Sequence, residues 1–298
     1  MATLREVRRR ISSVQSTQKI TKAMKMVATA KLRRAQMAAV SSRPYAKKMR
    51  ETLASLAAAA ADYTNELLRE REARSVAVVV VTADRGLCGG FNSNLIRAAG
   101  NFVEERYPGW MAQGKVKIFC VGKKGADFLM RRKFPVVQKY VGLFDRLAIA
   151  QAHAIAADLV DGFVKGDFDR VEVVYNQFKS MTRQEIVIEQ FLPVPARALQ
   201  GEPGGVAARP VDYIYEPSKE RLLEAMIPKH LNFQLWRVLL ESNAAEQAAR
   251  MTAMENATTN ARELIQELQL QYNKARQASI TKELLEIVGG AEALKQAG

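Results

Sequence analysis

The fold of this chain is constrained above all by a long amphipathic helix predicted at each end. The first covers residues 2–60, and its apolar residues begin at the 3–4–3 spacing of a coiled-coil seam. The seam opens with Leu4, Val7, Ile11 and Val14. Its phase is then expected to drift through Ile20, Met24, Val27 and Leu32. Pro44 predicts a kink or a break, because proline removes a helix hydrogen bond.

The second long helix is predicted from Pro217 to the end of the chain, with Pro228 as a candidate early kink. A seam with 3–4 spacing is visible in it twice, the second time one position out of phase. The first seam consists of Ile265, Leu268, Tyr272, Ala275 and Ser279. The second consists of Ile280, Leu284, Ile287, Ala291 and Leu294.

These helices are too long to be covered by the segment between them. About 60 helical residues extend roughly 90 Å, several times the width of a small domain. Each apolar stripe therefore needs another partner, and the other terminal helix is the simplest one. We expect an antiparallel coiled coil, a shaft that carries one globular foot. The predicted parts are an N-terminal shaft helix at 1–73, a foot domain at 74–195, a loop at 196–211 and a C-terminal shaft helix at 212–298.

The middle of the chain has the alternating pattern of an α/β domain. Residues 76–81 form a continuous apolar run, which is typical of a strand that is buried on both faces. A glycine-rich turn follows, and Asn92 is expected to cap the next helix. The other expected elements are strands 115–121, 136–140, 170–178 and 185–191, and helices 92–107, 123–132 and 146–164. This succession predicts a mostly parallel sheet with helices on its faces.

The positive charge of the chain is concentrated in one segment. The formal net charge is +14, and residues 1–50 contribute 14 basic side chains against the single acid Glu6. Such a stripe predicts an acidic protein surface, nucleic acid or anionic lipid as partner. Two features argue against nucleic acid: the basic residues share their helix with a seam, and Tyr45 is the only aromatic residue there for base stacking. A basic coiled coil that binds a nucleic-acid duplex remains the alternative to a mechanical shaft.

The remaining composition indicates a soluble, cytoplasmic chain. Its two cysteines, Cys88 and Cys120, are too few for a disulfide framework and are expected to be reduced and partly buried. The longest uncharged apolar run, Leu53–Ala61, is too short to span about 30 Å of hydrocarbon. No apolar segment of a signal peptide follows the early arginines, so no targeting sequence is expected.

Little in the sequence indicates catalysis. The two histidines, His153 and His230, have no second ligand at metal-binding spacing. The turn at Ala83–Gly90 contains glycines, but not at the G-x-G-x-x-G spacing of a dinucleotide site, and lysines stand where that site needs an acid. We expect a tight strand–helix turn, with Asp84 and Arg85 as an ion pair that pins it.

Three motifs resemble the gamma-subunit family of F-type ATP synthases. The first is Ile20-Thr21-Lys22-Ala23-Met24-Lys25-Met26-Val27-Ala28 on the first helix. The second is the turn Asp84-Arg85-Gly86-Leu87-Cys88-Gly89-Gly90. The third runs from Tyr272 through Ser279-Ile280-Thr281-Lys282-Glu283 to Glu286 and Gly290-Ala291. The motifs lie on three elements, in the family's order, and cover nearly the whole chain.

This resemblance implies a Rossmann-like foot domain and a function without catalysis on this chain. The paired helices would form the central rotor stalk inside a hexamer of alternating alpha and beta subunits. The foot would rest on the membrane c-ring beside the epsilon subunit, and Mg-ATP and ADP would bind to partner subunits. The chain would bind no cofactor, metal or nucleic acid, and it would not insert into the membrane. The absence of cysteine from 196–210 and of a transit peptide implies a bacterial enzyme, at the cytoplasmic face of the inner membrane.

The resemblance also implies contact residues for the beta subunits. By their place in the motifs, Met24 and Lys25 would lie where the shaft meets a moving lever of beta. Polar contacts with a beta loop would come from Arg250, Gln277, Thr281 and Glu283. The apolar end around Leu284–Leu294 would act as a bearing in the hexamer.

Overall fold

The computed structural model describes residues 3–59, 63–181, 183–195 and 215–297. The chain forms two compact units, one of Met1–Val27 with Met251–Gly298 and one of Ala28–Arg250. Each unit takes a part of both terminal helices. The units therefore cut across the predicted division at residues 73 and 211, which stays a prediction. The predicted loop 196–211 lies outside the described residues.

The larger unit is built on a five-stranded sheet in the order β3-β2-β1-β4-β5. Its strands are β1 (Val76–Val81), β2 (Val116–Val121), β3 (Val136–Tyr140), β4 (Arg170–Phe178) and β5 (Gln184–Leu192). All neighbouring pairs are parallel except β4 and β5. The predicted mostly parallel sheet is thus confirmed, and so are its five strands within one residue at each end.

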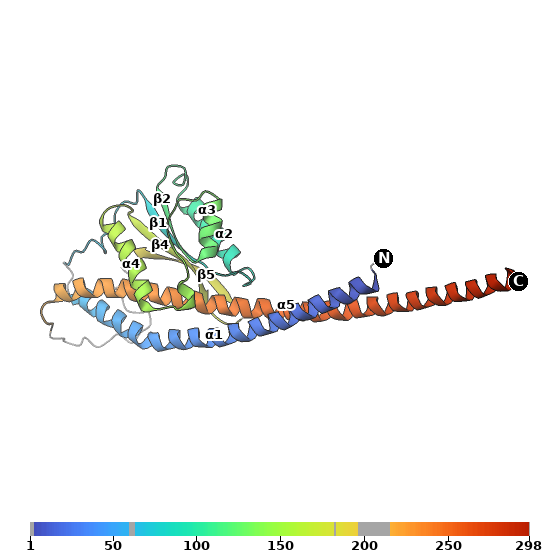
Figure 1. The fold of residues 1–298 in the computed structure, drawn as a ribbon. Helices are drawn as coiled ribbons and strands as arrows, with labels where there is room; N and C mark the ends of the chain where they lie inside the picture. The colour runs from blue at the N-terminus through green and yellow to red at the C-terminus, as the bar shows by residue number, and fades with distance from the viewer. Residues whose placement is uncertain (1–2, 60–62, 182, 196–214, 298) are drawn as a thin grey trace. The chain divides into compact units, whose positions relative to one another are not determined.

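Helices cover both faces of this sheet (Figure 1). Val76, Val78 and Val80 of β1 pack with α2 (Phe91–Arg106) and α3 (Lys123–Arg131). The alternate β1 residues pack with α4 (Ile149–Val164) and with parts of the two terminal helices. Every residue of β1 is fully buried, which explains why this strand is a continuous apolar run. A 3-10 turn, Leu143–Asp145, precedes α4. The helix begins at Ile149 and not at the predicted residue 146.

The terminal helices are α1 (Leu4–Ala59) and α5 (Lys219–Ala297). Both helices continue through their prolines, so a break at Pro44 does not occur, while the kinks at Pro44 and Pro228 stay predictions. Both prolines are on the exposed side of their helices. The carbonyl that each proline leaves without a donor can therefore be hydrated, which lowers the cost of an internal proline.

The buried face of α1 keeps its 3–4 spacing throughout, so the predicted drift in phase is wrong. Ile20 and Val27, which suggested that drift, are 60% and 57% exposed. The buried or half-buried positions that keep this spacing are Leu4, Val7, Ile11, Val14, Gln18, Thr21, Lys25, Ala28, Leu32, Ala35, Ala39, Ser42, Ala46, Met49, Leu53 and Leu56. Several of these residues are polar, so a search for apolar residues alone does not detect the full repeat.

The smaller unit is a two-stranded antiparallel coiled coil. Thr21 Oγ1 and Thr258 Oγ1 share a hydrogen bond of 2.7 Å, and Lys25 forms an ion pair with Glu255. As one helix advances the other recedes, so the predicted antiparallel pairing is confirmed. The buried positions on α5 keep 3–4 spacing. They are Met254, Ala261, Ile265 and Leu268.

In the larger unit the same two helices pack against each other and the sheet. Leu53 and Leu56 of α1 belong to one cluster with Leu223 and Ile227 of α5. The Tyr45 and Phe233 rings are 5.1 Å apart between centroids. None of the helices in the described ranges is both long and apolar enough to cross a bilayer.

Candidate functional site

The carboxyl edge of the parallel sheet is where an open α/β fold usually binds its ligand. In this strand order the chain reverses its winding direction between β1 and β4, and a crevice is expected there. Here α5 covers that edge. Ala245 of α5 is buried in one cluster with Ala83, Cys88 and Phe91, and Phe178 and Ala249 pack against it. The crevice is therefore filled by the chain's own helix.

The turn after β1, residues 84–90, is held by hydrogen bonds from several elements. The Asp84 carboxylate accepts two bonds of 3.0 Å, from the backbone N–H groups of Lys123 and Gly142. Arg85 pairs with Asp145 at 3.0 Å. The predicted ion pair between Asp84 and Arg85 does not form, because each residue has a partner far along the chain.

Asn92 closes the same turn from inside α2. Its side-chain oxygen accepts a 2.8 Å bond from the N–H of Ala83, and its amide donates to Cys88 Sγ at 3.2 Å. The helix begins at Phe91 with Gly90 as N-cap, so the predicted capping role of Asn92 is wrong. Gly89 has φ of +59°, a conformation that favours glycine. The glycines thus shape a tight turn.

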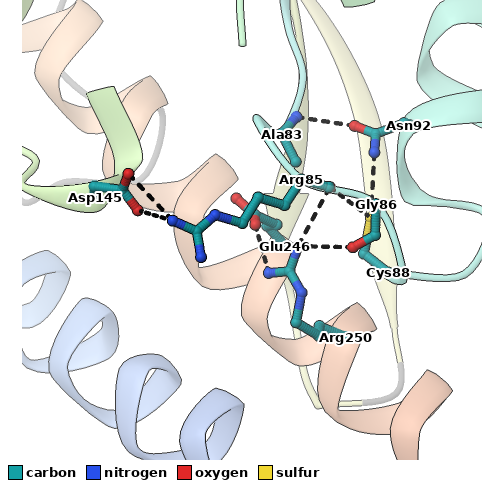
Figure 2. A network of polar contacts seen from close by, with 8 residues as sticks. All are labelled: Ala83, Arg85, Gly86, Cys88, Asn92, Asp145, Glu246 and Arg250. Atoms are coloured by element: carbon teal, nitrogen blue, oxygen red, sulfur yellow. Dashed lines mark hydrogen bonds and ion pairs between the residues drawn. The ribbon is translucent and has the colours of Figure 1, made fainter. Parts of the chain in front are cut away.

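Arg250 joins α5 to this turn (Figure 2). Its Nη2 lies 3.2 Å from the carbonyl oxygen of Gly86 and 3.4 Å from that of Arg85. Its Nη1 pairs with Glu246 one helical turn earlier. The two charged side chains are only 11% and 6% exposed. Burial raises the pKa of Glu246, and the Arg250 guanidinium opposes that rise.

A second buried polar group joins α5 to the sheet. Arg237 donates to Glu189 of β5 at 2.6 Å and to Tyr175 of β4 at 3.1 Å, and it also pairs with Glu241. Sequence reasoning missed this group and Glu246. These charged residues lie on a helix face that is otherwise rich in alanine and leucine. A charge on such a face predicts a buried polar partner, because a buried charge must be paired.

The six predicted contact residues fall into three places. Met24 and Lys25 are half-buried in the coiled coil, where Lys25 pairs with Glu255. Gln277, Thr281 and Glu283 are exposed on α5, and the Thr281 hydroxyl donates to the Gln277 carbonyl at 3.0 Å. Some 20 helical residues separate these two groups, which is roughly 30 Å. Arg250 lies in the other unit, engaged with Glu246 and the turn.

The described residues contain no group of three or more His, Cys, Asp or Glu side chains placed to hold a metal ion. His153 is exposed, whereas His230 is buried and its pKa is lowered to about 4 by burial and by nearby Arg237 and Arg50. Cys88 and Cys120 are free and buried, as expected. Burial raises the pKa of both thiols, so neither is an activated nucleophile.

Comparison with known proteins identifies the family of this chain. The sequence model of the family described as ATP synthase matches residues 3–294. The ATP synthase gamma chain of Chloroherpeton thalassium is 51% identical over 99% of both chains. That of Chlorobaculum tepidum is 50% identical over 99% of this chain and all of the relative. The chain belongs to the ATP synthase gamma-chain family. Gamma chains are non-catalytic subunits that form the central rotor stalk of F-type ATP synthases.

Solved structures share the fold of this gamma-chain family member. A chain of the Euglena gracilis mitochondrial ATP synthase (OSCP, F1 and c-ring) aligns with a TM-score of 0.70, over 98% of this chain and 94% of the other, at 23% identity. A chain from the central stalk and c-ring of the Tetrahymena thermophila enzyme gives 0.58 at 27% identity, over 80% of this chain and 99% of the other. The α/β sheet with two long terminal helices is thus the fold of a gamma stalk.

Proposed function

We propose that this chain is the rotating central stalk of a bacterial F-type ATP synthase. It couples ion translocation through a membrane c-ring to ATP synthesis or hydrolysis on beta subunits. The proposal is carried by identity near 50% to ATP synthase gamma chains along the full length of both proteins. The same observation decides against a nucleic-acid-binding coiled coil. This chain has no catalytic site of its own, and Mg-ATP and ADP bind to partner subunits.

The proposed assembly contains one copy of this chain, surrounded by three alpha and three beta subunits. Epsilon and the c-ring complete the rotor, and the whole lies peripherally at the cytoplasmic face of the inner membrane. The similar chains come from structures of F1 with the c-ring, of the rotor, and of the central stalk with the c-ring, which supports these partners. The basic residues of α1 would face acidic surfaces of the surrounding subunits.

Coupling follows from asymmetry. Three identical catalytic sites surround one shaft without threefold symmetry, so each rotor angle gives every site different contacts. Those contacts bias the open–closed equilibrium of each site, and by reciprocity its nucleotide occupancy biases the rotor angle. Exposed ion pairs are worth about 0–1 kcal/mol each, so charged contacts along the stalk can be exchanged as it turns.

The contact residues are part of this proposal. Met24 and Lys25 would meet the beta lever, and Gln277, Thr281 and Glu283 would meet a beta loop farther along α5. Arg250 would serve the same interface through the turn that it holds. The apolar end around Leu284–Leu294 would form the bearing. Its large exposed apolar residues include Leu284, Leu285, Ile287 and Val288.

Reconstitution tests the proposal directly. The chain is mixed with purified bacterial alpha and beta subunits, and the assembly is examined by native mass spectrometry and ATPase assay. We expect one copy per three alpha and three beta subunits and restoration of cooperative ATPase activity. Failure to assemble, together with retention on duplex DNA that falls steeply with salt, would reverse the choice between the two functions.

A further inference from the structure

One ion pair of the smaller unit joins a basic residue of α1 to an acid of α5. Lys25 pairs with Glu255, and their side chains are 36% and 54% exposed. Residues 1–27 carry seven basic side chains and a single acid, Glu6. Within the described part of this unit, no other basic residue of α1 forms an ion pair with α5. Lys25 is therefore the basic residue of this segment whose charge α5 compensates.

The packing of the coiled coil determines which acid Lys25 meets. The 2.7 Å hydrogen bond between the Thr21 and Thr258 hydroxyls fixes how far the two antiparallel helices overlap at this level. Thr21 is only 8% exposed, so this bond lies inside the seam. The next layer lies four residues on in α1 and three residues back in α5, where Lys25 and Glu255 stand side by side. The pair is thus built into the register of the coiled coil.

Stability does not explain this pair well. An exposed ion pair gains little free energy, because water screens both charges and two long side chains lose conformational freedom. The buried residues of the seam, such as Thr21, Met254 and Ala261, already hold the helices together at this level. The effect of the pair on the outer surface is larger. An ammonium group held against a carboxylate attracts the carboxylate of another molecule less strongly than a single charge does.

We infer that Glu255 is a positioning residue for rotation: it holds the Lys25 ammonium and balances its charge, so that Lys25 does not bind acidic surfaces of the beta subunits. The inference rests on the proposed rotor function, which places Lys25 at the beta lever. With three beta subunits around one shaft, each side of the shaft passes every beta subunit once per revolution. Without Glu255, Lys25 would form a new ion pair at each passage, and that pair must break before the next step.

The test compares variants of the pair in the complex reconstituted with alpha and beta subunits. Glu255→Gln removes the carboxylate charge and keeps the size of the side chain, whereas Glu255→Asp keeps the charge. A double variant combines Lys25→Gln with Glu255→Gln and so removes both charges. Glu263→Gln is the matched control, because Glu263 is an exposed acid farther along the same helix.

The maximal rate of ATP hydrolysis and the KM for ATP are measured over a range of salt concentrations. For Glu255→Gln we expect a maximal rate about twofold to fivefold below wild type at low salt, the range that one exposed ion pair supplies. This deficit should shrink at high salt, where exposed charges are screened. The KM should stay within about twofold, because the nucleotide sites are unchanged. The double variant and Glu255→Asp should recover most of the lost rate, and Glu263→Gln should match wild type.

A wild-type rate for Glu255→Gln at low salt would overturn the inference, and so would a deficit that salt does not change. A deficit that persists in the double variant would also overturn it, because the pair would then act only by holding the helices together. If Glu255→Gln does not assemble, the charge-swapped variant with Lys25→Glu and Glu255→Lys decides. It keeps the pair, so a wild-type rate is expected, and a loss of about fivefold would contradict the inference. Failure of the wild-type chain to join alpha and beta would instead reject the proposed function itself.

Discussion

Acid should weaken the larger unit through one buried histidine, and the size of the effect can be worked from the structure. His230 of α5 is 9% exposed, and its pKa falls from 6.5 to about 4. Burial is the main cause, and the positive charges of Arg237 and Arg50 add to it. The imidazole is therefore neutral in the folded chain at pH values where it is protonated in the unfolded chain.

The sign follows from proton binding. Above pH 6.5 both states are neutral at this position, and the group contributes no pH dependence. Between pH 6.5 and about 4 the unfolded state binds more protons, so stability falls as the pH falls. From pH 8 to pH 4.5 the loss that belongs to His230 is about 2.5 kcal/mol. In the variant His230→Gln this contribution is absent.

The assay is urea unfolding of the wild-type chain and of His230→Gln, followed by tryptophan fluorescence, with Trp236 in the same stretch of α5 as the probe. All other titrating groups are common to both chains, so the difference between their unfolding free energies isolates the histidine. Relative to its value at pH 8, the difference should change by about 2.5 kcal/mol in favour of the variant at pH 4.5. Parallel pH curves for the two chains would refute the reasoning.

Three further changes have defined outcomes. Met24→Lys should slow ATP-driven turnover roughly fivefold with assembly intact, because a new ion pair of about 1 kcal/mol must break at each step; unchanged turnover would count against the contact proposed there. Deleting residues 287–298 should lower the torque measured on single molecules more than the yield of assembled enzyme, and complete loss of assembly would assign that end a docking role. Gly122→Ala should cost about 3 kcal/mol or more in denaturant unfolding, because a Cβ would lie 2.2 Å from the Thr82 carbonyl oxygen at φ of +92°; a loss below 1 kcal/mol would show that the backbone relaxes there.

The architecture could be predicted from the sequence because it follows from local periodicity. The run Val76–Val81 is apolar at every position because both faces of β1 are covered, and the first seam of α5 keeps 3–4 spacing from Met254 to Ser279. Ile280, Leu284 and Ile287 of the predicted second seam are exposed in this chain. The α1 seam was harder to find. Thr21 holds a buried position by sharing a hydrogen bond with Thr258, a residue that the local pattern cannot identify.

The polar links of the α/β domain could not be predicted because their partners are far along the chain. Asp84 and Arg85 are adjacent, which suggested a pair, yet each bonds to groups about 40–60 residues away. The resemblance to the gamma-subunit family predicts that Arg250 contacts a partner subunit. In the structure its guanidinium is engaged by Glu246 and the turn. Only the folded chain brings these groups together.

The last turns of α5 favour self-association of the free chain at high concentration. Residues 280–291 are exposed along their whole length, and Leu284, Leu285 and Ile287 are more than half exposed. Bare leucine and isoleucine on a single helix promote self-association. In a cell, copies of this chain made in excess of the partner subunits that cover these residues would aggregate or be degraded by proteases. Synthesis of the chain must therefore be balanced with synthesis of those partners.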